Sequence, residues 1–259
     1  MAFTNPFDGK GAKNRIYHYC KLSTAIDYIL PSMNLRISPM KNMNDPRENK
    51  SFIFSGVAGP ETEIGNIMDR NAEISKILRE DCKVLCFCED IPYDMYGYEL
   101  SRMWALYGDN HKGVCIELDK DAFILENNID PTLFKNIQYY QFDSKNQFNY
   151  KIVDYNALQA HGLEIYIKEH FRYTHLDYLF FTKNKEWESE YEFRLVHFSK
   201  NPNDEFCSIK NSIRNIYVGV DFEENNLDNL IKSCPQIDIS KLEFFDVRMS
   251  PKEIYKGRP

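Results

Sequence analysis

The sequence predicts an α+β fold, and three observations lead to this class. Segments with strand composition cluster along the chain, and helical segments interrupt them without the regular alternation of a parallel α/β sheet. No Gly/Ser-rich linker and no internal repeat divides the 259 residues. The composition, 43% hydrophobic and 27% charged, is that of a globular protein with a core of ordinary size. We therefore expect a flexible arm over residues 1–14 and one domain over 15–259, with a helical insertion near 145–180.

The first half of the chain is expected to open with a strand, a helix and a second strand. RIYHYC (15–20) has strand composition. STAIDYIL (23–30) has apolar residues at helical spacing, with Ser23 or Thr24 as the N-cap and Pro31 just past the end. Further strands are expected at 34–39, 83–90 and 113–120, and helices at 60–81 and 99–109.

The second half is expected to be mainly helical up to residue 180 and richer in strands after it. The segment 135–142 is strand-like within the helical part, and EYEFRLVHF (190–198) is the strongest strand of the chain. A strand over 212–220, a helix over 223–234 and a last strand over 242–249 follow.

Bulk charge and cysteine content exclude several classes. The net charge of -7 argues against a general nucleic-acid binder, although a local basic groove stays open. No apolar run of ~18 residues and no apolar signal core are present, so no membrane span is expected. The seven cysteines have no framework spacing, and we interpret them as reduced and the protein as cytoplasmic. Cys82, Cys86 and Cys88 are interpreted as buried strand residues, because a second pair of zinc ligands is missing.

WESEYEFRL, Trp187 to Leu195, is the most informative short segment. Glu188, Glu190 and Glu192 alternate and Arg194 follows in step. In a strand they would share one face. Such a face is commonly solvated, but like charges close together cost stability. A ligand cleft that receives a cation or a cation-like transition state would also explain them.

Several separated blocks resemble a widespread bacterial family, domain of unknown function 2971, over roughly residues 15–255. The blocks are YHY (17–19), LRIS (35–38), NDP-x-E (44–48), CFC (86–88), MWALYGDNHKGVCIEL (103–118), K-x-x-x-W-x-x-E-x-E-F-R (183–194) and IYVG (216–219). The family usually has Ser where this chain has Cys88, so we assign that position no role.

The layout of a strand histidine, an aromatic element and a late E-x-E pair is similar to the ADP-ribosyltransferase superfamily. This resemblance implies a split, mostly antiparallel β-sheet core with helical insertions, and NAD as the substrate. It implies that Glu192 stabilises the cation-like ribose and that Glu190 selects or activates the acceptor. The remaining NAD-binding candidates are His18 for ribose, Tyr19, Trp104 and Tyr107 among the aromatics, Arg47 and Lys183 for the diphosphate, and Arg194 to hold the carboxylates.

Three functions stay open on the sequence alone. The first is an enzyme that transfers ADP-ribose to a nucleic acid or a protein, or hydrolyses NAD, as a toxin or phage-defence effector with an antitoxin or defence partner. A basic groove around Arg36, Lys41, Arg47 and Lys50 would serve a nucleic acid. The second is a nucleotide-sensing module without turnover. The third is a magnesium-dependent nuclease with Glu188, Glu190 and Asp119 as ligands.

Overall fold

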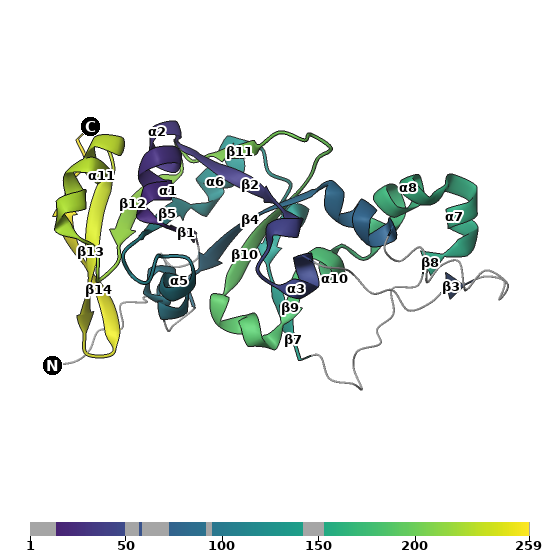
Figure 1. Cartoon of the computed structure of the whole chain (residues 1–259), viewed down its shortest axis with the longest axis horizontal. Coiled ribbons are helices and arrows are strands. Elements are labelled where there is room, and N and C mark those ends of the chain that lie inside the picture. The colour runs from purple at the N-terminus through teal and green to yellow at the C-terminus, as the bar shows by residue number, and fades with distance from the viewer. Residues whose placement is uncertain (1–13, 50–56, 59–72, 92–94, 142–152, 259) are drawn as a thin grey trace.

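The computed structural model describes residues 14–49, 57–58, 73–91, 95–141 and 153–258. These residues form one large sheet with helices around it, so the predicted α+β class is confirmed (Figure 1). The expected N-terminal arm, apart from Asn14, lies outside the described residues. Of the one or two helices expected over 60–81, residues 60–72 also lie outside them, and residues 73–80 are helical. Among the described helices, none is both long and apolar enough to cross a membrane.

The main sheet has ten strands and is mostly antiparallel. Eight strands follow the order β11-β2-β4-β1-β5-β12-β13-β14, while β10 pairs with β4 and with β6. The pair β12–β13 is parallel. The strands are β1 (Arg15–Cys20), β2 (Asn34–Pro39), β4 (Cys82–Glu89), β5 (Val114–Asp119), β6 (Phe134–Asn136), β10 (Glu192–Phe198), β11 (Glu205–Ser208), β12 (Ile213–Val218), β13 (Asp238–Phe245) and β14 (Arg248–Tyr255).

Short helices and two small parallel sheets complete the described fold. The small sheets pair β3 (Val57–Ala58) with β8 (Val153–Asp154), and β7 (Gln138–Tyr140) with β9 (Thr182–Asn184). The longer α-helices are α5 (Ser101–Leu106), α6 (Lys120–Asn127), α7 (Tyr155–His161), α10 (Leu176–Phe180) and α11 (Leu227–Ser233). The shorter ones are α1 (Leu22–Thr24), α2 (Leu30–Ser32), α3 (Pro46–Asn49), α8 (Leu163–Ile165) and α9 (Arg172–Thr174). The 3-10 and π segments are η1 (Ala25–Ile29), η2 (Met40–Asn42), η4 (Gly97–Glu99), η5 (Pro131–Leu133), η6 (Tyr166–Phe171), η7 (Lys185–Glu190) and η8 (Glu224–Asn226). The hairpin β13–β14 lies at one end of the molecule, and α7 and α8 lie at the other (Figure 1).

The sheet is split beside β4. Along one edge β4 pairs with β10 from Cys82 to Cys88. Along its other edge it pairs with β2 at Lys83 and Val84, and with β1 only at Cys88 and Glu89. Between those contacts β1 and β2 diverge from β4, so the middle of this edge faces an opening instead of a strand.

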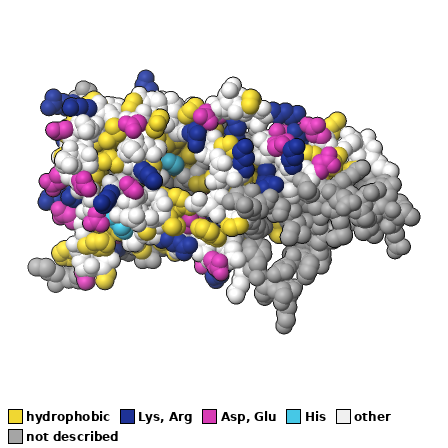
Figure 2. Space-filling model, viewed as in Figure 1, with side chains coloured by type: hydrophobic (Ala, Val, Ile, Leu, Met, Phe, Trp, Pro, Cys, Tyr) yellow, Lys and Arg dark blue, Asp and Glu magenta, His cyan; other side chains and the backbone are white. Residues whose placement is uncertain are grey.

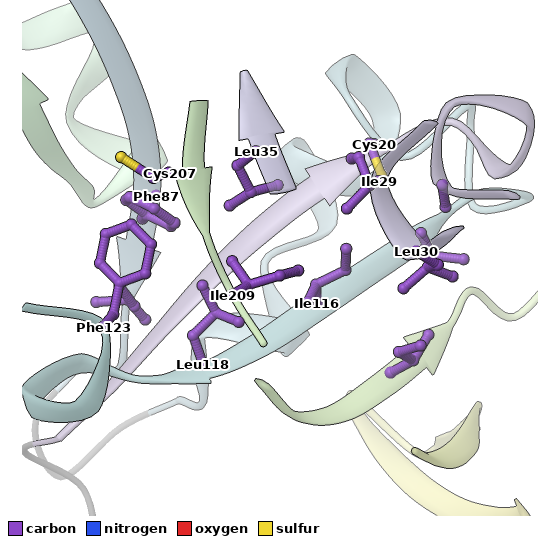
Figure 3. Close-up of a cluster of buried hydrophobic side chains, with 14 of the residues drawn as sticks. Cys20, Ile29, Leu30, Leu35, Phe87, Ile116, Leu118, Phe123, Cys207 and Ile209 are labelled. Atoms are coloured by element: carbon purple, nitrogen blue, oxygen red, sulfur yellow. The ribbon is translucent and has the colours of Figure 1, made fainter. Parts of the chain in front are cut away.

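Apolar side chains cover both faces of the sheet. On one face, β1, β4, β5 and β10 contribute alternate residues to a single cluster, which also contains Phe123 of α6 and Ile209 after β11 (Figure 3). On the other face there are two clusters, one around Phe171 and Phe180 and one around Trp104 and Tyr217. Cys82 and Val84 of β4 belong to the first and Cys88 to the second.

Three local predictions need correction. The strand expected at 190–198 begins only at Glu192, because 185–190 form a 3-10 helix and Tyr191 turns the chain with a φ of 46°. Glu188 and Glu190 therefore do not share a strand face with Glu192. The strand expected at 242–249 contains a hairpin turn, where Asp246 has a φ of 60°. Pro31 lies inside the last helical turn, which ends at Met33 in the left-handed conformation, and Lys21 occupies the N-cap.

Candidate functional site

A pocket of about 620 Å³ lies at the split in the sheet. Its wall includes residues of β1, the divergent part of β2 and the unpaired edge of β4. Six of the predicted site residues line it, namely His18, Tyr19, Tyr107, Lys183, Glu190 and Glu192. A volume of this size is in the range of small-molecule and cofactor sites. Residues far apart in the sequence thus meet because the sheet opens between β1 and β4.

A cluster of five buried charged residues forms one side of this pocket. Glu48, Lys183, Glu190, Glu192 and Arg194 are each at most 5% exposed. Lys183 Nζ lies 2.9 Å from Glu190 Oε2 and 2.6 Å from Glu192 Oε2. With all five groups ionised, three carboxylates face two cations, and the cluster has a net charge of one negative unit. This cluster separates the two apolar clusters on its face of the sheet.

Arg194 lies behind the pocket wall and positions the carboxylates. Its Nε donates to Glu192 Oε1 at 2.6 Å, and its two Nη atoms donate to the two oxygens of Glu48. Nη1 also donates to the carbonyl of Phe180 at 2.9 Å. Such a two-pronged pair fixes geometry as well as charge. Arg194 is predicted to hold both Glu190 and Glu192; it contacts Glu192, whereas Glu190 contacts Lys183 and Tyr107.

Opposing effects act on the pKa of Glu192. Burial raises the pKa of this carboxyl, but the cations of Arg194 and Lys183 outweigh burial and lower it to about 2. Burial lowers the pKa of Lys183, yet Glu192 and Glu48 raise it well above its ordinary value. The two residues therefore stay charged at neutral pH. The Lys183 ammonium also lies 5.4 Å from the centre of the Trp187 ring, which Arg102 approaches at 5.5 Å.

Glu190 is joined to the outer part of the pocket by Tyr107. The Tyr107 hydroxyl donates to Glu190 Oε1 at 2.9 Å and accepts from Asn44 Nδ2 at 3.1 Å. Burial and the neighbouring Glu190 raise the pKa of Tyr107, so the phenol stays neutral. The Asn-Asp-Pro sequence predicts that Asn44 and Asp45 either cap a turn or touch a ligand, and Asn44 lines the pocket.

Glu48 is a site residue that the sequence analysis did not select. It lies in α3, directly after that turn, and is 2% exposed. The NDP-x-E block (44–48) could have identified Glu48, because this carboxylate is the last residue of the block and closely follows the Asn-Asp-Pro turn. Tyr139 of β7 was also missed, although its hydroxyl accepts a 2.9 Å hydrogen bond from the backbone N–H of Glu192.

His18 bridges the split of the sheet. Its Nδ1 lies 3.1 Å from the carbonyl of Cys86, so Nδ1 carries the proton and donates. Burial lowers the pKa of His18, and the neutral ring leaves Nε2 as an acceptor. Strand alternation in RIYHYC predicts that Ile16 and Cys20 share the face of His18 and that Tyr17 and Tyr19 point away. In agreement, Ile16 and Cys20 belong to one cluster and Tyr17 and Tyr19 to another.

Two aromatic candidates have structural partners near the site. The Tyr19 hydroxyl donates to the carbonyl of Gly97 at 2.6 Å, and its ring packs edge-on against Trp104. Trp104 is fully buried, and its Nε1 donates to the carbonyl of Tyr98. Trp104 and Tyr107 are one helical turn apart in sequence, which predicts that both face the same way. This prediction is wrong, because Tyr107 lies past the end of α5 and turns toward Glu190. Trp104 lies behind Tyr19 instead of in the pocket wall.

Two further predictions concern charged groups. The Arg47 side chain lies outside the described residues. The three ligands of the nuclease hypothesis are not brought together, since no group of three His, Cys, Asp or Glu in the described part of the chain is placed to hold a metal ion. Asp119 instead caps α6 and pairs with Arg214, and Glu188 is exposed.

The cysteines match their predicted environment. All seven are free, and six of them are buried. Cys86 is half-buried in the pocket wall, and burial raises the pKa of its thiol well above the ordinary value. A neutral thiol is a poor nucleophile, so the carboxylates are the reactive candidates of this wall.

Basic and acidic side chains are interspersed over the visible surface of the described residues (Figure 2). Of the basic residues predicted to form a groove, Arg36 and Lys41 are exposed, while Lys50 and the Arg47 side chain lie outside the described residues.

The comparisons with known proteins bear on the middle of the chain. Residues 103–195 match a family model described as "Protein of unknown function (DUF2971)". The match supports the predicted resemblance to this family, over a shorter range than 15–255, and covers Tyr107, Lys183, Glu190 and Glu192. No curated protein matches the chain, and no solved structure matches it.

Proposed function

We propose that the protein is an NAD-dependent ADP-ribosyltransferase and that the split sheet is the ADP-ribosyltransferase-like core predicted from the sequence. The observation that carries the proposal is the pair Glu190 and Glu192 in the wall of one pocket. Lys183 contacts both carboxylates, and with all five groups ionised the cluster carries one excess negative charge. A preorganised negative group of this kind stabilises positive charge that develops during a reaction.

The reaction would begin with cleavage of the bond between ribose C1′ and the nicotinamide nitrogen. The electron pair of this bond leaves with nicotinamide, and the ribose becomes cation-like. Glu192 stabilises this charge, and His18 Nε2 accepts a hydrogen bond from a ribose hydroxyl. Glu190 accepts the proton of the acceptor group as that group bonds to C1′.

The acceptor in this proposal is a macromolecule, nucleic acid or protein, with water as the hydrolytic alternative. Such an activity depletes NAD or inactivates its target. Because such an activity harms the cell that contains it, we propose a role as a toxin or phage-defence effector that acts with an antitoxin or defence partner.

One observation favours a second candidate, a nucleotide-sensing module without turnover. Both oxygens of Glu192 are engaged, Oε1 by Arg194 and Oε2 by Lys183. Both oxygens of Glu190 are engaged too, by Tyr107 and Lys183. A carboxylate that already has two strong partners stabilises a cation-like ribose less than a free carboxylate does. Such a pocket would bind NAD without cleaving it.

Incubation with NAD labelled in the adenine ring separates the two candidates. The protein is incubated with and without cell lysate, and nicotinamide release and label transfer are followed. For a transferase we expect wild type and the matched control Glu188→Gln to release nicotinamide and label a lysate fraction, and Glu192→Gln to do neither. Binding of NAD by calorimetry without nicotinamide release over hours would select the sensor. Equal turnover by Glu192→Gln would overturn the assignment of Glu192.

A further inference from the structure

The pocket has a second wall, on the opposite side of β4 from β10. Strands β2 and β11 form this wall, where Arg36 pairs in register with Phe206. Residues directly opposite on antiparallel strands share one face. Leu35 and Cys207 lie on the other face, in the core. Arg36 and Phe206 therefore project together on the solvent side of this ribbon.

Aromatic rings are unusually exposed at this wall. Phe206 is 55% exposed, and Tyr28 of η1, which also lines the pocket, is 71% exposed. One exposed aromatic residue is unremarkable in a protein surface. Phe206 is paired in register with Arg36, and Tyr28 lines the same pocket; an exposed ring next to a guanidinium suits a flat ring linked to an anion.

Arg36 has only a weak competing partner. Its Nη1 lies 3.6 Å from Asp204 Oδ2, and both side chains are more than half exposed. Exposed ion pairs of this kind contribute little to stability. An incoming phosphate can therefore replace Asp204 at the guanidinium, where bidentate contacts are favourable.

We infer that Arg36 and Phe206 of this wall, together with Tyr28 of the pocket lining, bind a nucleobase and its phosphate. This inference rests on the proposed function, because it assigns the two walls of the pocket to the two ends of one nucleotide ligand. The charged cluster faces the reacting ribose, and the β2–β11 wall faces the base and phosphate. The nucleotide is either the adenylate end of NAD or a nucleotide of a single-stranded acceptor.

Calorimetry with two ligands that lack nicotinamide tests the inference. The ligands are 5′-AMP and a short single-stranded oligonucleotide, and the variants are Phe206→Ala, Tyr28→Ala and Arg36→Gln. The matched control is Phe245→Ala, since Phe245 is 78% exposed on the β13–β14 hairpin. Loss of a stacking partner should weaken binding roughly tenfold or more, and the control should bind like wild type.

The ligand that responds identifies the source of the nucleotide. Weakened 5′-AMP binding assigns the wall to the adenylate end of NAD, and weakened binding of the oligonucleotide alone assigns it to the acceptor. Adenosine should bind Arg36→Gln and wild type equally, because it has no phosphate. Failure of both nucleotides to bind, or binding unchanged in Phe206→Ala and Arg36→Gln, would overturn the inference.

The outcome is separable from that of the proposed function. Nucleotide binding that depends on Phe206, without any nicotinamide release from NAD, would retain the nucleobase wall and reject the transferase. The protein could instead release nicotinamide while Phe206→Ala changes neither the KM for NAD nor the nucleotide affinity. That result would retain the transferase and reject the nucleobase-binding role of the wall.

Discussion

Lys183 and Glu192 form a buried ion pair with a 2.6 Å separation between Nζ and Oε2. Lys183 belongs to β9 and Glu192 begins β10, so the 3-10 helix η7 between them returns the chain onto itself. The same ammonium holds Glu190, the last residue of η7, at 2.9 Å. One cation thus joins the two ends of the segment that contains both candidate carboxylates.

Lys183→Met should strongly destabilise the fold. The variant would leave Glu190 and Glu192 buried without their shared cation, and breaking a buried pair in this way costs about 3–5 kcal/mol. Urea unfolding followed by circular dichroism measures the difference. Lys185→Met is the control, because Lys185 lies two residues further along the chain, at the start of η7, and is exposed. A loss below about 1 kcal/mol would mean that water already solvates the carboxylates.

Stability should fall in acid because of Glu192. Its folded-state pKa of about 2 lies below the value near 4.3 that is usual for an unfolded chain. A lowered pKa contributes stability above the unfolded value, and that contribution is lost as the pH falls from about 4.5 toward 2. The free energy of unfolding, measured between pH 6 and 2.5, should decline more steeply for wild type than for Glu192→Gln. Parallel declines would contradict the assignment.

Glu48 and Arg194 should be energetically coupled. Glu48→Gln and Arg194→Met each remove one side of the buried bidentate pair, so the second substitution should cost less once the first is present. Contacting residues of this kind show interaction energies of about 0.5–3 kcal/mol. A double-mutant cycle by chemical unfolding checks this value. Additive losses would show that the two side chains act independently.

Tyr107→Phe should leave the fold intact and alter the site. The variant keeps the ring but loses the hydrogen bonds to Glu190 and Asn44. The expected net loss in the free energy of unfolding is about 1 kcal/mol. The unfolding free energy should change by about that amount, while NAD binding or turnover should fall severalfold. Tyr140→Phe is the control, because the Tyr140 hydroxyl donates to the exposed Gln138, away from Glu190 and Asn44. If Tyr107→Phe and Tyr140→Phe bind and turn over NAD equally, Tyr107 is not part of the site.

Gly97→Ala should be destabilising through its contact with Tyr17. A Cβ at this position would lie 2.2 Å from Tyr17 Cδ2, and the ring is fully buried. Overpacking of this kind typically costs about 1–3 kcal/mol. Thermal unfolding of Gly97→Ala, and of the same change combined with Tyr17→Leu, tests the cause. The smaller side chain at position 17 should recover part of the lost stability. If it recovers none, the destabilisation does not come from the contact with Tyr17.

The sequence by itself determined the α+β class, most strand positions and the residue types of the site. Alternation in β1 correctly separated the face of His18 from that of Tyr17 and Tyr19, because strand periodicity is a local property. The motif around Lys183, Glu190 and Glu192 was also visible, since its members are close in sequence.

Tertiary structure alone decided how those residues meet. Local pattern suggested one strand face for Glu188, Glu190 and Glu192, yet Tyr191 adopts a left-handed turn and β10 begins after it. The pocket exists because β1 and β2 diverge from β4, which no local pattern encodes. Glu48 reaches Arg194 across 146 positions of the chain, so a buried charge that looks unpaired in sequence acquires its partner only when the sheet assembles.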